Sequence, residues 1–234
     1  MGAILKREIH AYFSTPLGYV FLAVFYFFSG FYFFAGVLYQ NSTDLSVVFE
    51  SMFMIIMLLV PILTMRLFSE DYKTGTDQLL LTSPVSVSGL VYGKFFAAYA
   101  VFAIGAAVMV VYALVMALFA PLAWFSIIGN LIGLLLLGGA LVSIGLFVSA
   151  LTQNQVVAAA GAFGVILFFM YLDTFSSIIP ISWLETLFTQ LSFMGRYRDF
   201  TSGLINIADI IYFFSVMVMF NFFTIRIVEK KRWS

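Results

Sequence analysis

The sequence contains no cysteine, a single histidine and few charged residues. Without cysteine the chain can form no disulfide, no thiolate metal site and no cysteine nucleophile. Because His10 is the only histidine, an imidazole cluster for zinc, copper or haem is also excluded, and its polar neighbours predict a surface position. Charged residues make up 9% of the 234 positions, whereas a soluble domain carries about 25%. Water is therefore not the main solvent of this surface.

The chain also has no excess of positive or negative charge. Eleven basic residues balance eleven acidic residues, so no overall basic field indicates a nucleic-acid partner. The positions of the charges are then more informative than their sum.

Long apolar runs are what the sequence has in abundance. A membrane helix needs about 20 apolar residues, because each residue adds about 1.5 Å toward about 30 Å of hydrocarbon. The first run is too long for the apolar region of a signal peptide and is expected to remain as a span. The sequence predicts an all-α polytopic membrane protein, a single domain over residues 1–234, with six transmembrane helices at residues 17–38, 48–65, 95–118, 127–150, 156–172 and 210–227.

The basic residues predict the orientation, since Lys and Arg accumulate on the cytoplasmic side of a membrane. With the N-terminus inside, only Arg196 and Arg198 fall outside. We therefore expect a multi-pass protein of the inner (cytoplasmic) membrane with both ends in the cytoplasm. The basic residues on that side are Lys6, Arg7, Arg66, Lys73, Lys94, Arg226, Lys230, Lys231 and Arg232.

Residues 1–16 have the pattern of a short amphipathic helix that lies in the cytoplasmic interface and ends before Pro16. The alternative is an ordinary positively charged flank of the first span. Apolar Ile4, Leu5, Ile9, Tyr12 and Phe13 are set against polar Lys6, Arg7, Glu8 and His10.

The cytoplasmic loop, residues 66–94, is predicted to carry a second short helix. Gly75 can adopt the positive φ that ends one helical turn, and Thr76 can cap the next. The apolar face of residues 79–81 must be buried against something, and Pro84 stops the helix before the third span. The loop therefore has the features of a docking segment.

The loop reads a basic residue, Arg66, then after Leu67 Phe-Ser-Glu-Asp, and later Gly-Thr, a Leu run, Ser-Pro and Gly-Lys-Phe. This pattern resembles the loop of ABC-2 type transporter permeases, in particular the gliding-motility permease (GldF-like) group, and the resemblance extends over nearly the whole chain. It includes Lys6-Arg7-Glu8, Thr15-Pro16-Leu17-Gly18-Tyr19, Thr152-Gln153-Asn154-Gln155 and Ile210-Ile211-Tyr212-Phe213.

The resemblance implies that the loop between spans two and three is a coupling helix seated in a cleft of a separate ATPase subunit. The loop after span four is implied to make a smaller second contact. Carried over to this sequence, the ATPase-coupling roles fall on Glu70, Asp71, Gly75, Thr76, Asp77 and Pro84, and on Gln153 and Asn154.

The chain itself lacks a convincing phosphate-binding loop. The nearest candidate, residues 89–95, has three residues between its glycines instead of four, and Phe95 replaces the Ser or Thr that would hold magnesium. Small residues for close packing and a snorkelling Lys94 explain it better. We expect no enzymatic activity and no cofactor in this chain, with ATP and Mg bound by the partner ATPase.

The outer loop, residues 173–209, contains apolar stretches too short to span, which favours re-entrant or interfacial helices between spans five and six. Arg196, Arg198 and Asp199 could there meet substrate or an extracytoplasmic partner, or they could anchor the loop at the membrane surface. In span four, small residues permit close packing, either within the chain or against a second copy. These are Gly129, Gly133, Gly138, Gly139 and Gly145.

The function expected from the residues and the resemblance is the permease subunit of an ATP-driven ABC exporter. Its partners would be an ABC ATPase, a second permease chain and the lipid bilayer, and an auxiliary protein with a periplasmic domain could join them if the complex does mechanical work. The alternative is an ion-coupled secondary transporter or channel, for which Asn221 is the clearest polar candidate within the spans. An intramembrane enzyme is disfavoured, because no nucleophile and base pair shares the spans.

Overall fold

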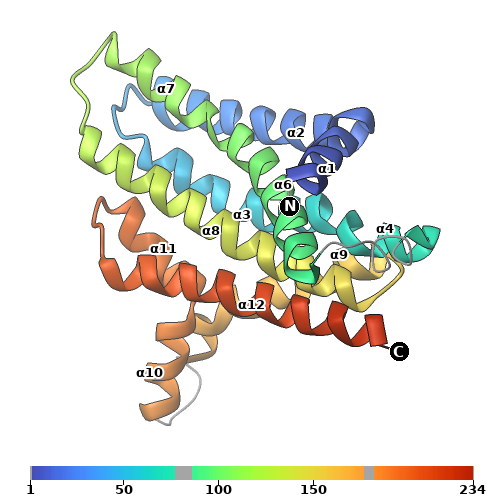
Figure 1. Cartoon of the computed structure of the whole chain (residues 1–234). Coiled ribbons are helices and arrows are strands. Elements are labelled where there is room, and N and C mark those ends of the chain that lie inside the picture. Colours follow the sequence, from blue (N-terminus) through green and yellow to red (C-terminus); the bar gives the residue numbers. More distant parts are fainter. Residues whose placement is uncertain (1, 77–85, 177–181, 234) are drawn as a thin grey trace.

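The computed structural model describes residues 2–76, 86–176 and 182–233, and in these residues every regular element is helical. Six helical segments are long and apolar enough to cross a membrane, which confirms the predicted fold class. Their order along the chain is easy to follow in Figure 1. The helices are α1 (Gly2–Ser14), α2 (Pro16–Phe33) with the π-helical turn η1 (Phe34–Leu38), α3 (Ser46–Thr64), α4 (Arg66–Thr74), α6 (Val87–Ala106), α7 (Val108–Ala117), α8 (Trp124–Leu151), α9 (Gln155–Ser176), α10 (Ser182–Leu191), α11 (Phe193–Thr201) and α12 (Ile207–Trp233).

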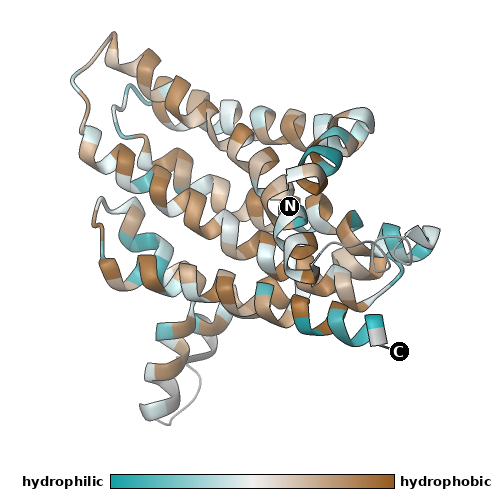
Figure 2. Ribbon diagram, in the orientation of Figure 1, coloured by the Kyte–Doolittle hydropathy of each residue, from teal (hydrophilic) through white to brown (hydrophobic). Residues whose placement is uncertain are grey.

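The six crossings give the bundle two ends. At the right in Figure 1 lie α1, α4 and the last turns of α12, and we call this the α4 end. At the left lie α11 and the turns that precede α3 and α8, and we call this the α11 end. Polar residues gather on the short helices and at the end of α12, whereas apolar residues dominate the long helices (Figure 2).

Helix α8 occupies the centre of the bundle and is its most buried span. It packs against α12, α3, α9, α11 and α6. Glycine is required along it, because a Cβ atom at Gly138 would lie 2.0 Å from the Phe102 ring and one at Gly145 would lie 2.0 Å from the Thr64 hydroxyl. A Cβ at Gly133 would lie 2.6 Å from Phe200. These glycines therefore pack within the chain, which decides between the two alternatives left by the sequence.

The third span begins earlier than predicted. Its helix α6 starts at Val87 instead of residue 95, and the Ser86 hydroxyl caps it by accepting a hydrogen bond from the Gly89 amide at 3.2 Å. The prediction from hydrophobicity set the start of the span at residue 95, where the continuous apolar run begins. The serine that caps the helix lies about two turns before that residue. This shift brings Lys94 inside the bundle.

Two short helices separate the last two spans, as predicted. Figure 1 shows α10 directed away from the bundle and α11 lying along it. The side chains of Phe193, Tyr197 and Phe200 on α11 are buried, so α11 is part of the core and not only a surface element.

Candidate functional site

Helix α4 continues α3 beyond a junction at Met65, and α8 holds this junction. The Ser149 hydroxyl of α8 donates to the Met65 carbonyl at 3.0 Å and accepts from the Phe68 and Ser69 amides at 3.0 and 3.2 Å. The first amides of a helix have no partner within it. Ser149 thus caps α4 from another helix, a role that no local sequence pattern indicates.

The other end of α4 has the predicted glycine turn. Gly75 adopts a left-handed conformation with φ of 70°, which confirms the expectation from sequence. The Thr76 hydroxyl donates back to the Asp71 carboxylate at 3.1 Å. The predicted roles of Asp77, residues 79–81 and Pro84 lie outside the described residues.

A buried cluster of charges joins α4 to α1 and α6. The Lys94 ammonium, on a side chain only 1% exposed, lies 3.0 Å from a Glu8 carboxylate oxygen and 2.7 Å from an Asp71 carboxylate oxygen. It also donates to the Leu67 carbonyl. The expectation of a snorkelling Lys94 was therefore wrong, because the early start of α6 turns this residue toward α1 and α4.

Glu8 also departs from its predicted place on the polar face of the first helix. It is 7% exposed and lies against Lys94 and Arg7. Burial alone would raise the pKa of Glu8, but the charges and hydrogen bonds of Lys94 and Arg7 outweigh burial and lower it. Helix α1 is amphipathic as predicted, with His10 exposed, yet it covers α6 as well as facing outward.

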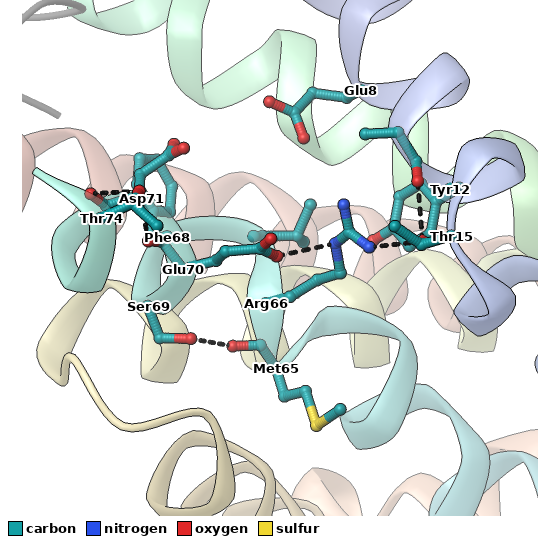
Figure 3. Close-up of polar contacts among 12 residues, drawn as sticks. Glu8, Tyr12, Thr15, Met65, Arg66, Phe68, Ser69, Glu70, Asp71 and Thr74 are labelled. Atoms are coloured by element: carbon teal, nitrogen blue, oxygen red, sulfur yellow. Dashed lines mark hydrogen bonds and ion pairs between the residues drawn. The ribbon is translucent and has the colours of Figure 1, made fainter. Parts of the chain in front are cut away.

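Arg66 forms a second link between α4 and the N-terminal helices. Its guanidinium donates to the Thr15 hydroxyl at 2.7 Å and pairs with Glu70 at 3.1 Å, as Figure 3 shows. It also lies 5.4 Å from the centre of the Tyr12 ring. The Tyr12 hydroxyl donates to the Leu63 carbonyl at 2.8 Å. Glu70 is thus paired within the chain while part of its side chain remains exposed.

The C-terminal helix contacts α4 as well. The Lys231 ammonium lies 3.5 Å from the centre of the Tyr72 ring and donates to the Ala150 carbonyl at 3.1 Å. A cation over an aromatic face is attracted to it. The basic end of α12 therefore lies against α4 and the end of α8.

One residue of α4 meets the turn that follows the fourth span, whereas the assigned residues Glu70, Asp71 and Thr76 line the separate cleft between α1 and α4. Lys73 of α4 lines a cavity of about 390 Å³ together with Gln153, Asn154, Gln155 and Val156 of the turn between α8 and α9. Gln153 and Asn154 are exposed, and the Asn154 side chain accepts from the Val156 amide at 2.9 Å. We call Lys73, Gln153 and Asn154, together with the exposed Gly75 two residues beyond Lys73, the docking surface. Asp71, in contrast, is directed inward to Lys94.

At the α11 end, Arg196 is tied into the fold. Its guanidinium lies 2.5 Å from the Asp209 carboxylate, donates to the Gln190 carbonyl at 2.7 Å and stacks over Tyr212 at 4.5 Å. Burial raises the pKa of Asp199, and the nearby Asp209 carboxylate raises it further. Of the three predicted outer residues, Arg198 is the one whose side chain is exposed.

The glycine-containing segment 89–95 lies within helix α6. A phosphate-binding loop precedes a helix and presents its free amides to the phosphates, whereas these residues belong to the helix itself. The segment therefore packs α6 against α1 and α4.

Comparison with known proteins gives one family. A family model described as ABC-2 family transporter protein matches residues 4–232, which is nearly the whole chain. No curated protein matches the chain in a sequence search.

Proposed function

The chain belongs to the ABC-2 family of transporter proteins, and we propose that it is the permease subunit of an ATP-driven exporter whose ATPase binds at the α4 end. Permeases of this family are membrane components of transport, and they normally work with an ABC ATPase. The ATP and Mg would be bound by that partner.

The observation that carries the proposal is the docking surface. Lys73 and Gly75 follow the second span, Gln153 and Asn154 follow the fourth, and the lining of the 390 Å³ cavity brings the two segments together. Two loops distant in sequence that share one exposed surface can bind a single partner. The inward pairs of Glu70 and Asp71 support a different role for those two residues, namely holding α4 in place for docking.

The α4 end is proposed to face the cytoplasm. Lys73, Lys230 and Arg232 are exposed there, in keeping with the accumulation of basic residues on the cytoplasmic side. The chain has no cysteine, so single cysteines can report the orientation. A membrane-impermeant thiol reagent that is added to intact cells should label the Ser42→Cys variant from outside and should not label the Lys230→Cys variant. The reverse pattern would place the docking surface outside and refute the assignment.

We further propose that two such chains, or this chain and a similar one, pair in the transporter, and that the substrate leaves near α10 and α11. If the complex instead acts on a periplasmic assembly, as the resemblance to the gliding-motility group suggests, the partner at the α11 end would be a protein, and the exposed Arg198 would be a contact residue for it.

Co-purification of the ATPase with the full chain in lipid nanodiscs tests the proposal. Gly75→Val should strain the left-handed turn by about 1–3 kcal/mol. The double variant Lys73→Glu with Asn154→Lys should invert the charge at position 73 and place a longer, positively charged side chain at position 154 of the docking surface. Both variants should lose ATPase binding while inserting normally. Arg198→Glu is the matched control, because it changes an exposed charge at the opposite end. Normal binding by all docking variants, or equal loss in the control, would refute the proposed surface.

A further inference from the structure

Helices α1 and α4 pack on different parts of the bundle. Helix α1 packs mainly on α6 and α2, whereas α4 packs mainly on α8 and α9. A cleft of about 260 Å³ separates them, and its lining includes Ala11 of α1 and Thr74 of α4. The contacts that cross from α1 to α4 are therefore made by long polar side chains at the border of this cleft.

The Lys94 ammonium is the central contact among these. This ammonium donates hydrogen bonds to Glu8 of α1 at 3.0 Å and to the Leu67 carbonyl of α4, and it forms an ion pair with Asp71 of α4 at 2.7 Å. One cation that belongs to α6 thus holds α1 on one side and α4 on the other. The Phe68 ring lies 5.2 Å from the ammonium.

The cluster is balanced in charge. Lys94 and Arg7 face Glu8 and Asp71, with Arg7 2.5 Å from Glu8 and 4.0 Å from Asp71. Apolar residues of similar volume would fill such a site with equal or greater stability, because charges must lose their hydration on burial. Stability alone therefore does not account for the charges of Lys94, Glu8 and Asp71, whose side chains are at most 16% exposed, whereas that of Arg7 is 44% exposed. A network of ion pairs does, however, fix which residues meet and at what distance.

We propose that Lys94 is a positioning residue for coupling, which holds α1 and α4 together so that they move as one unit when the ATPase acts on the docking surface. This inference rests on the proposed function in taking the α4 end as the ATPase side. Helix α1 would then be part of the moving unit and not only an anchor at the membrane surface. The turn at Gly75 would act on α6 through Asp71 and Lys94.

Distances between spin labels test this in the complete transporter in lipid nanodiscs, using the absence of native cysteine. One pair, His10→Cys with Thr74→Cys, joins exposed positions on α1 and α4; a second, Thr74→Cys with Arg198→Cys, joins the two ends of the bundle. Trapping the ATPase with ATP and vanadate should shift the second distance and leave the first unchanged. A shift in the first distance would overturn the proposal.

The decisive variant removes the charges of Lys94 and of its two carboxylate partners: Glu8→Gln, Asp71→Asn and Lys94→Met together. It avoids the unpaired buried charge that Lys94→Met alone would leave, and Arg7, which is 44% exposed, keeps its charge in contact with water, so this variant should fold and insert. We expect the distribution of spin-label distances between α1 and α4 to broaden in this variant and to stay narrow in Lys94→Arg. Lys230→Met, an exposed lysine at the same end, is the control. If the triple variant keeps a narrow distribution of distances between the labels at positions 10 and 74 in the absence of nucleotide, Lys94 has no positioning role.

This design separates the two ideas. Failure of the ATPase to bind any version of the chain would refute the proposed function, whereas the distance without nucleotide would still decide the role of Lys94.

Discussion

At each end of α3, a buried tyrosine of a neighbouring short helix donates a hydrogen bond to a backbone carbonyl of α3. At the α4 end, the Tyr12 hydroxyl of α1 donates to the Leu63 carbonyl; at the α11 end, the Tyr197 hydroxyl of α11 donates to the Phe49 carbonyl at 3.1 Å. Around Tyr197 the contacts are aromatic, with Phe53 stacked at 5.2 Å. At Tyr12 a cation takes part, because the Arg66 guanidinium lies 5.4 Å from the centre of the ring and also pairs with Glu70.

This difference indicates which of the two sets of contacts allows displacement of the helices more readily. Close packing of aromatic side chains resists small displacements, because interiors are dense and leave few voids. Ion pairs and hydrogen bonds beside a cleft can be exchanged for contacts with water or a partner. We infer that the packing around Tyr197 is the more rigid and the contacts around Tyr12 the more adjustable, and four experiments can break or sharpen this comparison.

The largest effect is expected from Phe200→Ala at the α11 end. Phe200 is fully buried and packs over Gly133, so truncation should cost about 3–5 kcal/mol. Thermal unfolding in detergent micelles would measure the loss. Phe214→Ala, at a site 61% exposed on α12, is the matched control. Equal effects of the two changes would contradict a packed α11 end.

A smaller loss is expected from Ser149→Ala at the α4 end. It removes one donor and leaves the Phe68 and Ser69 amides without their acceptor, at about 1–3 kcal/mol. Ser143→Ala, equally buried on α8 but bonded only within that helix, should be nearly neutral. The same unfolding measurement compares them. If Ser143→Ala costs as much, the α3–α4 junction does not depend on Ser149.

Tyr12→Phe and Tyr197→Phe compare the two ends directly. Each removes a buried hydroxyl that donates to a carbonyl of α3, so each should cost about 0.5–1.5 kcal/mol. Their consequences should differ: only Tyr12→Phe is expected to weaken ATPase co-purification, because it loosens α1 beside the junction of α3 with α4, the helix that carries Lys73 of the proposed docking surface. Equal weakening by Tyr197→Phe would mean that the two ends are not independent.

Changes of pH should act on the two ends with opposite sign and with the smallest effect. The pKa of Glu8 is lowered in the fold, so its stabilisation is present above its ordinary value of 4.5 and is lost as the pH falls through the lowered pKa. The pKa of Asp199, beside Asp209 and Arg196, is raised above 3.8, so the fold favours the protonated form and loses that benefit as the pH rises through the raised pKa.

Two neutral variants isolate these contributions. At neutral pH, Glu8→Gln should destabilise the protein and Asp199→Asn should stabilise it slightly. As the pH falls, the Asp199→Asn difference should shrink first, through the raised pKa of Asp199 above 3.8, and the Glu8→Gln difference should shrink later, through the lowered pKa of Glu8 below 4.5. Thermal unfolding over a pH series checks this. A difference that stays constant with pH would show that the variant acts through packing and not through charge.

The sequence predicts the spans well because length and hydrophobicity decide them, and Gly75 was predicted because its turn chemistry is local. The buried pairs were missed for the opposite reason. Lys94 and Glu8 are 86 positions apart, and Ser149 lies 81 positions from Phe68. Each residue, taken alone, looks like a flanking charge or an ordinary helix serine. Only the folded chain brings its partner near.

Both described ends of the chain, the start of α1 and the end of α12, lie at the α4 end of the bundle (Figure 1). If the ATPase binds at the docking surface as proposed, an ATPase domain joined to either end by a short linker would already be close to that surface. Such tethering turns association into an intramolecular event with a high effective concentration. A single gene fusion could thus convert a two-component assembly into a one-chain machine without any change within the membrane, whereas an ATPase tethered at the α11 end would be on the wrong side of the bundle.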